Sequence, residues 1–239
     1  MKKQKVPRYM LAKQYLLEQI RRMTPGDNKL ESEHTLTDKL GMSRETIRKA
    51  MGSLIQEGVI TRRHGKGNFG HPALSNLPMR IDLNSNFRRL LSEGGYHVMS
   101  KQSEPVIREA SLQMLHRMPE ARGKLVVAFM LNFYGSSRLA IAAEAELLKD
   151  IVKKMPESGE YQQDMGEFLK EHCTTESNHT TAWLQADCRQ DISQRFGISK
   201  ESPLLCWEEV YYNLFDEKMG YIKIYFNPEI MDLSMMLKF

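Results

Sequence analysis

Residues 30–69 constrain the fold of this chain more than any other stretch, because two short helical patterns there precede a basic glycine turn. In the second pattern, apolar side chains recur at helical spacing between Ile47 and Ile55, so one face of that helix is predicted to be buried. Residues 59–63 and 68–69 then have strand character on either side of the turn His64-Gly65-Lys66-Gly67. The order predicts two helices followed by a β-hairpin.

Polar residues and a glycine mark the ends of these helices. Ser32 can cap a helix that runs through Leu40, and Gly41 supplies the left-handed backbone that ends it. Ser43 can cap the next helix, and a further helix is predicted earlier in the chain, at residues 8–23. Three helices and a hairpin in this order predict a winged helix-turn-helix, which presents one helix to the major groove of DNA.

The composition limits the class of protein. The chain has 239 residues, which suits one large or two small domains, and its 41% hydrophobic content is too high for a disordered chain. No apolar run approaches the roughly 18 residues of a membrane span, and the N-terminus lacks the apolar core of a secretory signal. Cys173, Cys188 and Cys206 are odd in number and far apart, which indicates a reducing, cytoplasmic location.

The charge is unevenly distributed along the chain. The net charge of +4 is modest, but the excess of lysine and arginine lies in the first third. A basic region joined to a near-neutral or acidic one is typical of a DNA-binding module with an attached sensor. The stretch from Gly70 to Pro78 breaks both helical and strand patterns. We therefore predict a DNA-binding domain at residues 1–70, a linker at 71–80 and a second domain at 81–239.

The second domain mixes helical and strand patterns without a regular βαβ rhythm. This mixture predicts an α+β domain built on an antiparallel sheet. Helices are expected at residues 86–93, 163–172 and 187–196, and strands at 125–133, 203–215 and 221–226.

The solvent face of the third helix carries the candidate DNA contacts. Arg44 and Arg48 lie one helical turn apart, and the fork of an arginine can bond the O6 and N7 atoms of guanine together. Glycines in the hairpin turn allow the backbone to approach a groove closely. The residues predicted to contact DNA are His34, Ser43, Arg44, Glu45, Thr46, Arg48, Lys49, Arg63, His64, Gly65 and Lys66.

These motifs resemble the winged helix of the GntR family. The resemblance covers the whole N-terminal domain and implies a bacterial one-component regulator, most often a repressor, that binds a palindromic operator as a homodimer. It also implies DNA contacts at Ser43, Arg44, Thr46, Arg48 and the pair His64-Gly65. The matching segments are Leu30-Glu31-Ser32-Glu33, Leu40-Gly41-Met42-Ser43-Arg44, Ile47-Arg48-Lys49-Ala50, Glu57-Gly58-Val59-Ile60 and His64-Gly65-Lys66-Gly67-Asn68-Phe69.

Two residues depart from the family pattern. His34 stands where the family usually has arginine, and an imidazole that is mostly neutral at pH 7 is a weaker phosphate partner. Glu45 stands where a small hydroxyl residue is common. It can accept a hydrogen bond from a cytosine amino group, or pair with Lys49 one turn on, and we favour the pair. The departures predict an operator that differs from the commonest family site.

Five segments of the C-terminal part carry a second resemblance: Phe168–Glu171, Ile192–Ile198, Ser202–Leu205, Glu208–Tyr212 and Tyr221–Phe226. In these segments the chain resembles the UTRA effector domain of the HutC subfamily, and the resemblance implies a chorismate-lyase-like fold that binds a small-molecule effector.

This chain lacks the arginines that many such domains carry on the strand at Ala128–Phe133, and Asp164 replaces a phosphate-binding hydroxyl residue, so a sugar phosphate is disfavoured. Lys223 is either an anion partner or a solvent-facing lysine between two tyrosines. The candidate effector-binding residues are Asn132, Tyr134, Glu144, Glu209, Tyr211, Lys223 and Tyr225.

Three alternatives for the second domain stay open: an active enzyme, a dimerisation domain without a ligand, and the all-helical effector domain of another GntR branch. No nucleophile–base motif or phosphate loop supports catalysis, and the histidines and cysteines match no zinc spacing. We therefore expect a non-enzymatic transcriptional regulator without cofactor or metal. Its expected partners are double-stranded operator DNA, a small-molecule effector and a second copy of the chain, and no membrane.

Overall fold

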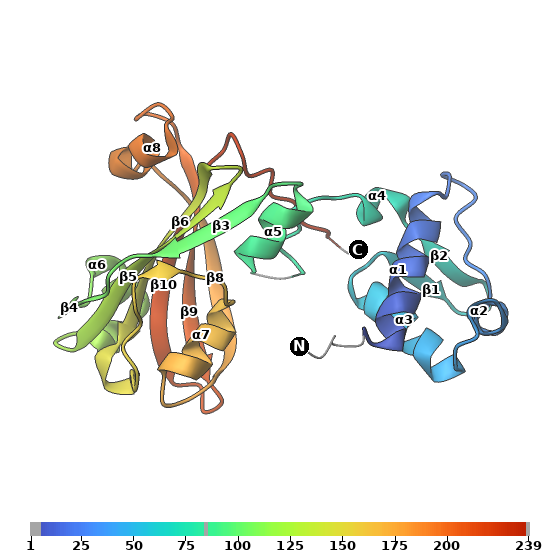
Figure 1. Ribbon diagram of the computed structural model, residues 1–239, viewed down its shortest axis with the longest axis horizontal. Helices are drawn as coiled ribbons and strands as arrows, with labels where there is room; N and C mark the ends of the chain where they lie inside the picture. The colour runs from blue at the N-terminus through green and yellow to red at the C-terminus, as the bar shows by residue number, and fades with distance from the viewer. Residues whose placement is uncertain (1–5, 84–85, 238–239) are drawn as a thin grey trace. The chain divides into compact units, whose positions relative to one another are not determined.

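The computed structural model describes residues 6–83 and 86–237 of the chain. The chain forms two compact units, one made of Met1–Asn84 together with Ser234–Phe239, the other of Ser85–Leu233 (Figure 1). The polypeptide therefore passes between the units twice. None of the helices in the described ranges is long and apolar enough to cross a membrane.

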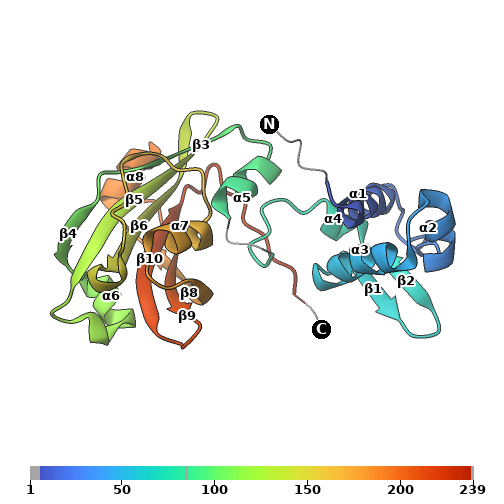
Figure 2. The same cartoon turned by 60° about the horizontal axis from the view of Figure 1, so that its bottom comes forward.

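The N-terminal unit is the predicted winged helix-turn-helix. Three helices are followed by an antiparallel hairpin in which Ile60 pairs with Gly70 and Arg63 with Gly67. Figure 2 shows the hairpin projecting beyond the helices. The elements are α1 (Arg8–Arg21), α2 (Glu33–Leu40), α3 (Arg44–Gln56), β1 (Ile60–Arg63), β2 (Gly67–Gly70) and the short α4 (Pro72–Ser75).

The helix ends are capped as the sequence predicts. The Ser32 hydroxyl accepts a hydrogen bond from the Thr35 amide at 3.1 Å, and the Ser43 hydroxyl accepts one from the Thr46 amide at 3.2 Å. Gly41 ends α2 with φ of 59°, in the left-handed region. These caps fix the turn between α2 and α3 and hence the start of the third helix.

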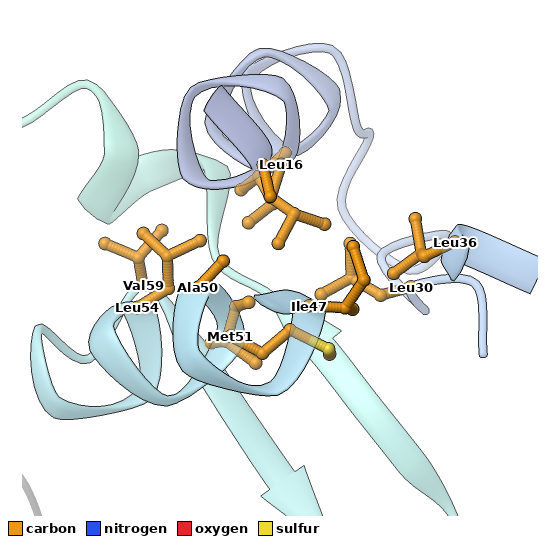
Figure 3. Packing of buried hydrophobic residues seen from close by; sticks show 11 residues of the cluster. Leu16, Leu30, Leu36, Ile47, Ala50, Met51, Leu54 and Val59 are labelled. Carbon is orange, nitrogen blue, oxygen red and sulfur yellow. The ribbon is translucent and has the colours of Figure 1, made fainter. Parts of the chain in front are cut away.

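One hydrophobic core holds the three helices and the hairpin together. Figure 3 shows Leu16 of α1 facing Ile47, Ala50 and Met51 of α3. All four side chains are fully buried, and each large one stabilises the fold by about 1.5–3 kcal/mol relative to exposure. The apolar stripe of α3 is thus committed to this core, which leaves its opposite face to solvent.

The segment around the predicted linker contains a short helix and a backbone pairing with the C-terminal stretch. Pro72 lies at the start of α4, where its missing N–H costs nothing. Met79 and Ile81 exchange backbone hydrogen bonds with Ser234, at 3.2 and 2.9 Å. This pairing joins residues more than 150 positions apart, so no local pattern could reveal it, and it places the C-terminal stretch in the N-terminal unit.

The C-terminal unit is built on an eight-stranded sheet, and every pairing between its described strands is antiparallel. The order is β7-β3-β5-β6-β10-β9-β8, with β4 paired to β5. This confirms the predicted α+β class, and the all-helical alternative is wrong. The strands are β3 (Val98–Gln102), β4 (Val106–Glu109), β5 (Leu125–Gly135), β6 (Arg138–Leu148), β7 (Gly159–Glu160), β8 (Ser177–Asp187), β9 (Leu204–Asn213) and β10 (Lys218–Phe226).

Helices cover both faces of the sheet (Figure 1). α5 and α7 pack on an aromatic face, which we define by Phe87, Phe129, Phe133, Tyr161 and Phe168. α6, η1 and α8 pack on the other face, around Tyr221 and Tyr225. The helices are α5 (Phe87–Glu93), α6 (Leu112–Arg117), η1 (Pro119–Ala121), η2 (Lys149–Ile151), α7 (Met165–His172) and α8 (Gln190–Phe196).

A row of charged residues crosses that second face. Met130, Glu144, Lys223, Glu208 and Trp183 are successive cross-strand partners, so their side chains share one face. In the neighbouring row Glu146 lies opposite Tyr221. We call this the charged face.

Candidate nucleic-acid interface and effector pockets

A basic groove runs between the N-terminal end of α3 and the β1–β2 hairpin. Its volume is about 650 Å³. Of the predicted DNA-binding residues, the groove is lined by His34, Arg44, Arg48, Arg63, His64, Gly65 and Lys66. Ser43, Glu45, Thr46 and Lys49 belong to the first turns of α3 or its cap, beside the groove.

Glu33 organises two arginines of this groove. Its carboxylate accepts a hydrogen bond from Arg48 Nε at 2.7 Å and another from Arg62 Nη2 at 3.0 Å. Arg62 also bonds its cross-strand partner Asn68 at 3.0 Å. Both arginine side chains are more than half exposed, and exposed ion pairs of this kind contribute at most about 1 kcal/mol. The arginines are therefore oriented but can exchange this partner for another anion.

Sequence reasoning placed Arg62 on the basic hairpin turn but did not include it among the predicted DNA contacts, and it did not place Glu33 and Asn68 in the site. The available signal for Arg62 and Asn68 was the hairpin register, which pairs residues at equal distance from the turn. Glu33 lay inside a matched motif, but an acidic residue is not an obvious component of a DNA-binding surface.

His34 and Glu45, the two residues that depart from the family pattern, both have exposed side chains. His34 Nδ1 lies 2.9 Å from the Asp38 carboxylate, one turn on. The favoured pair between Glu45 and Lys49 is wrong for the described residues, since Lys49 Nζ lies 4.6 Å from the centre of the Tyr9 ring instead. A cation over an aromatic ring gains about 0.5–1 kcal/mol at an exposed site, which competes with an exposed ion pair.

A small cavity lies on the aromatic face between α5 and α7. Its volume is about 20 Å³, which is room for one water molecule. Its lining includes the aromatic side chains of Phe87, Phe133, Tyr161 and Tyr211. Asp164, expected to repel an anion, lines this cavity and also caps α7, because its carboxylate accepts a hydrogen bond from the Glu167 amide at 2.8 Å.

Glu209 is buried on this aromatic face. Its carboxylate accepts hydrogen bonds from Trp207 Nε1, at 2.7 Å, and from the Tyr211 hydroxyl. Burial raises the pKa of Glu209 above its usual value, although both hydrogen bonds act in the opposite direction.

The charged face carries a much larger cleft, of about 480 Å³, lined by residues of β4, β5, β6 and β10 and by Arg189. Each cation that lines it has an acidic partner. Arg189 bonds both oxygens of Glu144, and Lys223 Nζ lies 2.7 Å from Asp187. Arg108 pairs with the buried Glu146 at 3.3 Å.

The seven candidate effector residues divide between the two faces. Glu209 and Tyr211 lie on the aromatic face, because Glu209 pairs with Ile222, the neighbour of Lys223 along β10. Lys223 is buried, so the solvent-facing interpretation of that residue is wrong. Asn132, Tyr134, Glu144, Lys223 and Tyr225 belong to the charged face.

The main residues missed on this face are Arg108, Arg189 and Glu146. The signal that could have found them is the alternation Glu144-Ala145-Glu146, where two carboxylates share one face of an otherwise apolar strand.

The N-terminal region is similar to a known family of proteins. Residues 9–69 match the model described as bacterial regulatory proteins, gntR family. The arabinose metabolism transcriptional repressor of Geobacillus stearothermophilus is 37% identical over 71 residues, 29% of this chain and 19% of the repressor. A fatty acid metabolism regulator protein of Haemophilus influenzae is 32% identical over 106 residues, 42% of this chain and 44% of the regulator. The chain thus spans less than half the length of these curated relatives.

Solved structures share the fold of nearly the whole chain. The possible transcriptional regulator YydK from Bacillus subtilis superposes with a TM-score of 0.69 at 16% identity, covering 98% of this chain and 100% of YydK. PhnF from Mycobacterium smegmatis gives a TM-score of 0.55 at 12% identity, covering 95% and 99%. At these identities the likeness establishes the two-part α+β architecture alone.

Proposed function

Because residues 9–69 form a helix-turn-helix domain of the gntR family, we propose that this chain is a transcriptional regulator whose operator binding is controlled by a small-molecule effector. The observation that carries the proposal is the groove between α3 and the hairpin, where exposed arginines and a glycine turn lie beside the capped start of α3. A capped helix with arginines at its N-terminal end fits the major groove, and a basic wing fits the adjacent backbone.

Arg44 and Arg48 are assigned to base contacts in this proposal, because they project from the first two turns of α3. Arg63, Lys66 and the His64-Gly65 turn are assigned to phosphates or to the minor groove. Ser43 and Thr46 serve phosphates beside the helix N-terminus, where the backbone dipole is positive. Glu45, left unpaired with Lys49, is assigned to a cytosine amino group.

The C-terminal unit is proposed to be a UTRA-type effector domain of the HutC subfamily. The antiparallel sheet with helices on both faces is the support for this assignment. We further propose that the protein acts as a homodimer in the cytoplasm, most simply as a repressor. Two-fold symmetry would present two copies of α3 to the halves of a palindrome.

Selection of DNA from a random duplex pool tests the DNA-binding role. The purified full chain should enrich a palindromic sequence, and its affinity for that sequence should exceed its affinity for scrambled DNA by about 10³-fold or more at physiological salt. Enrichment of no sequence, with equal affinity for all duplexes, would contradict a sequence-specific regulator. Chromosomal DNA upstream of the neighbouring genes provides an independent source of candidate operators.

A further inference from the structure

The cavity between α5 and α7 includes both places at which the resemblance leads us to expect effector contacts. Leu131 and Phe133 of β5 line it, and so does Asp164 at the start of α7. Asp164 is exposed, whereas Tyr161 is only 5% exposed, so the lining runs from the protein surface to a buried end. The volume of about 20 Å³ admits one water molecule or a chemical group of similar size. A ligand can therefore place a small head group in the cavity and must leave the rest of itself at the exposed end.

The lining of this cavity is negatively charged. Asp164 is the one lining residue in the described part of the chain that carries a full charge at neutral pH. Arg88 contacts the backbone carbonyl of Tyr161, but it is committed to that carbonyl and to the Ser100 hydroxyl. The start of α7 could attract an anion, but the Asp164 carboxylate already caps it and Glu167 adds a second negative charge to its first turn. The cavity therefore disfavours an anionic head group and favours a cationic one.

Four aromatic rings line the same cavity, those of Phe87, Phe133, Tyr161 and Tyr211. The Phe133 ring lies on edge against the rings of Phe87 and Tyr161, with centroids 5.5 and 6.0 Å apart. The face of an aromatic ring is electrically negative, so it attracts a cation and repels an anion. Aromatic cages are a general means by which proteins hold ammonium groups. Rings and a carboxylate together thus select the same sign of charge.

The hydroxyl group of Tyr161 is a further polar group of this lining. It has no hydrogen-bond partner among the described residues, whereas the Tyr211 hydroxyl donates to Glu209. Burial, and after it the charges of Asp164 and Glu167, raises the pKa of Tyr161, so its hydroxyl group stays neutral and its oxygen can accept. A primary ammonium group resembles a water molecule in size and carries three N–H donors. It can therefore donate to a carboxylate and to a phenol oxygen at the same time.

We propose that the effector of this regulator is an organic amine, protonated at neutral pH, whose ammonium group enters the cavity between α5 and α7 and pairs with Asp164. The hydrocarbon body of the amine then lies at the exposed end, beside Asn86, Gln163 and Met165. Both departures from the resemblance point the same way, because uncharged residues at Ala128–Phe133 remove positive charge and Asp164 adds negative charge. This inference rests on the proposed function and names the chemical class of its effector.

Calorimetry on the purified full chain tests the ligand class with matched sets of probes. Each set contains an amine, the corresponding alcohol and the corresponding carboxylate: tyramine, tyrosol and 4-hydroxyphenylacetate; 2-phenylethylamine, 2-phenylethanol and phenylacetate; putrescine, 1,4-butanediol and succinate. At least one amine should bind with a measurable Kd, and its alcohol and carboxylate should bind about tenfold more weakly or worse. Failure of all three amines to bind overturns the ligand class, and so does equal or tighter binding of the alcohol or the carboxylate.

Asp164→Asn tests the pairing with the ammonium group. Asparagine caps a helix about as well as aspartate does, so α7 should keep its start while the cavity loses its charge. The variant should bind the amine about tenfold more weakly and the alcohol as tightly as the native protein does, so that the preference for the amine falls toward one. Glu167→Gln is the control, because Glu167 belongs to the same turn but lies outside the set of lining residues, and it should change amine binding less than about threefold. Equal losses in the two variants would overturn the pairing with Asp164.

Tyr161→Phe covers the case in which Asp164→Asn does not fold. The phenylalanine ring can keep the contacts that Tyr161 makes with the rings of Phe133 and Phe168, and the charge and cap of Asp164 are untouched. Amine binding should weaken about threefold or more, since one acceptor of the ammonium group is lost. Unchanged amine binding in this variant counts against the site.

Operator affinity separates the two levels of the proposal. A saturating amine should change the affinity of the full chain for the selected operator by about fivefold or more. An amine that binds without changing operator affinity overturns its role as effector. Loss of DNA binding in the absence of amine contradicts the regulator, whereas intact DNA binding with no amine bound contradicts only the effector class.

Discussion

The guanidinium of Arg80 donates a hydrogen bond to the backbone carbonyl of Glu57, at a distance of 2.8 Å. Glu57 is the C-terminal cap of α3, whose last carbonyls lack partners within the helix. Arg80 also pairs with Asp82. Burial alone would raise the pKa of Asp82, but the hydrogen bonds and charge of Arg80 outweigh it and hold that pKa below its usual value. The chain after the hairpin is thereby fixed to the end of the proposed recognition helix.

Arg80→Ala is expected to destabilise the N-terminal unit by about 1–3 kcal/mol, because the half-buried Glu57 carbonyl and the Asp82 carboxylate both lose their partner. Urea unfolding of the full chain, followed by circular dichroism, measures the change. Arg89→Ala is the control, since that exposed arginine pairs with Glu93 one turn away and its loss should cost less than about 0.5 kcal/mol. Equal losses of unfolding free energy in the two variants would show that the Arg80 contact stabilises the unit no more than an exposed ion pair does.

Arg44→Ala and Lys66→Ala should weaken operator binding in different ways. Loss of a base-contacting arginine is expected to cost about 1–3 kcal/mol on the operator and much less on scrambled DNA. Loss of a phosphate-contacting lysine should weaken binding to both DNAs alike, and lower the slope of log K against log salt by about 0.9. Gel-shift titrations at several salt concentrations distinguish the two, and identical behaviour of both variants would reject the assignment of Arg44 to a base.

Glu33→Gln is expected to lower the preference for the operator and to raise the affinity for DNA of any sequence. The carboxylate holds Arg48 and Arg62, at 2.7 and 3.0 Å, and also adds a negative charge beside the proposed phosphate path. Its neutralisation should tighten binding to scrambled DNA and steepen its salt dependence, while the ratio of operator to scrambled affinity falls. Competition titrations measure this ratio, and a ratio that stays constant would mean that Glu33 does not orient Arg48 for base contacts.

Gly70→Ala should destabilise the N-terminal unit by about 1–3 kcal/mol through overpacking. A Cβ at Gly70 would come within 2.7 Å of Ile20 Cγ1, and Ile20 is fully buried in the core. Gly52→Ala is the matched control, because a Cβ there meets nothing within 4 Å in the middle of α3. It should stabilise the unit by about 0.5–1 kcal/mol, and urea unfolding of both variants should therefore give shifts of opposite sign.

The buried Glu209 should make stability depend on pH. Since burial raises the pKa of Glu209, its stabilising contribution is fully present below the pKa of an unfolded glutamate and is lost as pH rises through the folded value. The thermal midpoint of the native protein relative to Glu209→Gln should thus fall as the pH rises above the pKa of an unfolded glutamate. A difference between the two proteins that is independent of pH would show that Glu209 is ionised throughout.

The helices of the N-terminal unit were predictable because single residues of characteristic type mark their ends. Ser32, Gly41 and Ser43 each specify one backbone conformation, and the structure places a cap or a left-handed turn at all three. In the second unit, β8 was missed although it is 11 residues long. Most of its side chains are exposed, so it lacks the apolar alternation that marks a half-buried strand.

The candidate effector site was only partly predictable, because the sequence does not show which strands lie next to one another. Alternation along β10 correctly put Tyr221, Lys223 and Tyr225 on one face. Nothing in the sequence relates that face to β9, because cross-strand register depends on loop lengths and on packing. Glu209 and Tyr211 were therefore grouped with residues from which the sheet separates them. The partners of Lys223 and Glu144 come from near the start of α8, which follows β8.

The double passage of the chain between its two units has a mechanical consequence. A single flexible connection acts as a swivel, about which one body can turn freely against the other. Here a second connection leaves the C-terminal unit just before Ser234, and the backbone bonds of Ser234 to Met79 and Ile81 anchor it beside the first. Two connections that are hydrogen-bonded to each other limit rotation about either one, so the connection between the units is less free than a single flexible segment would be.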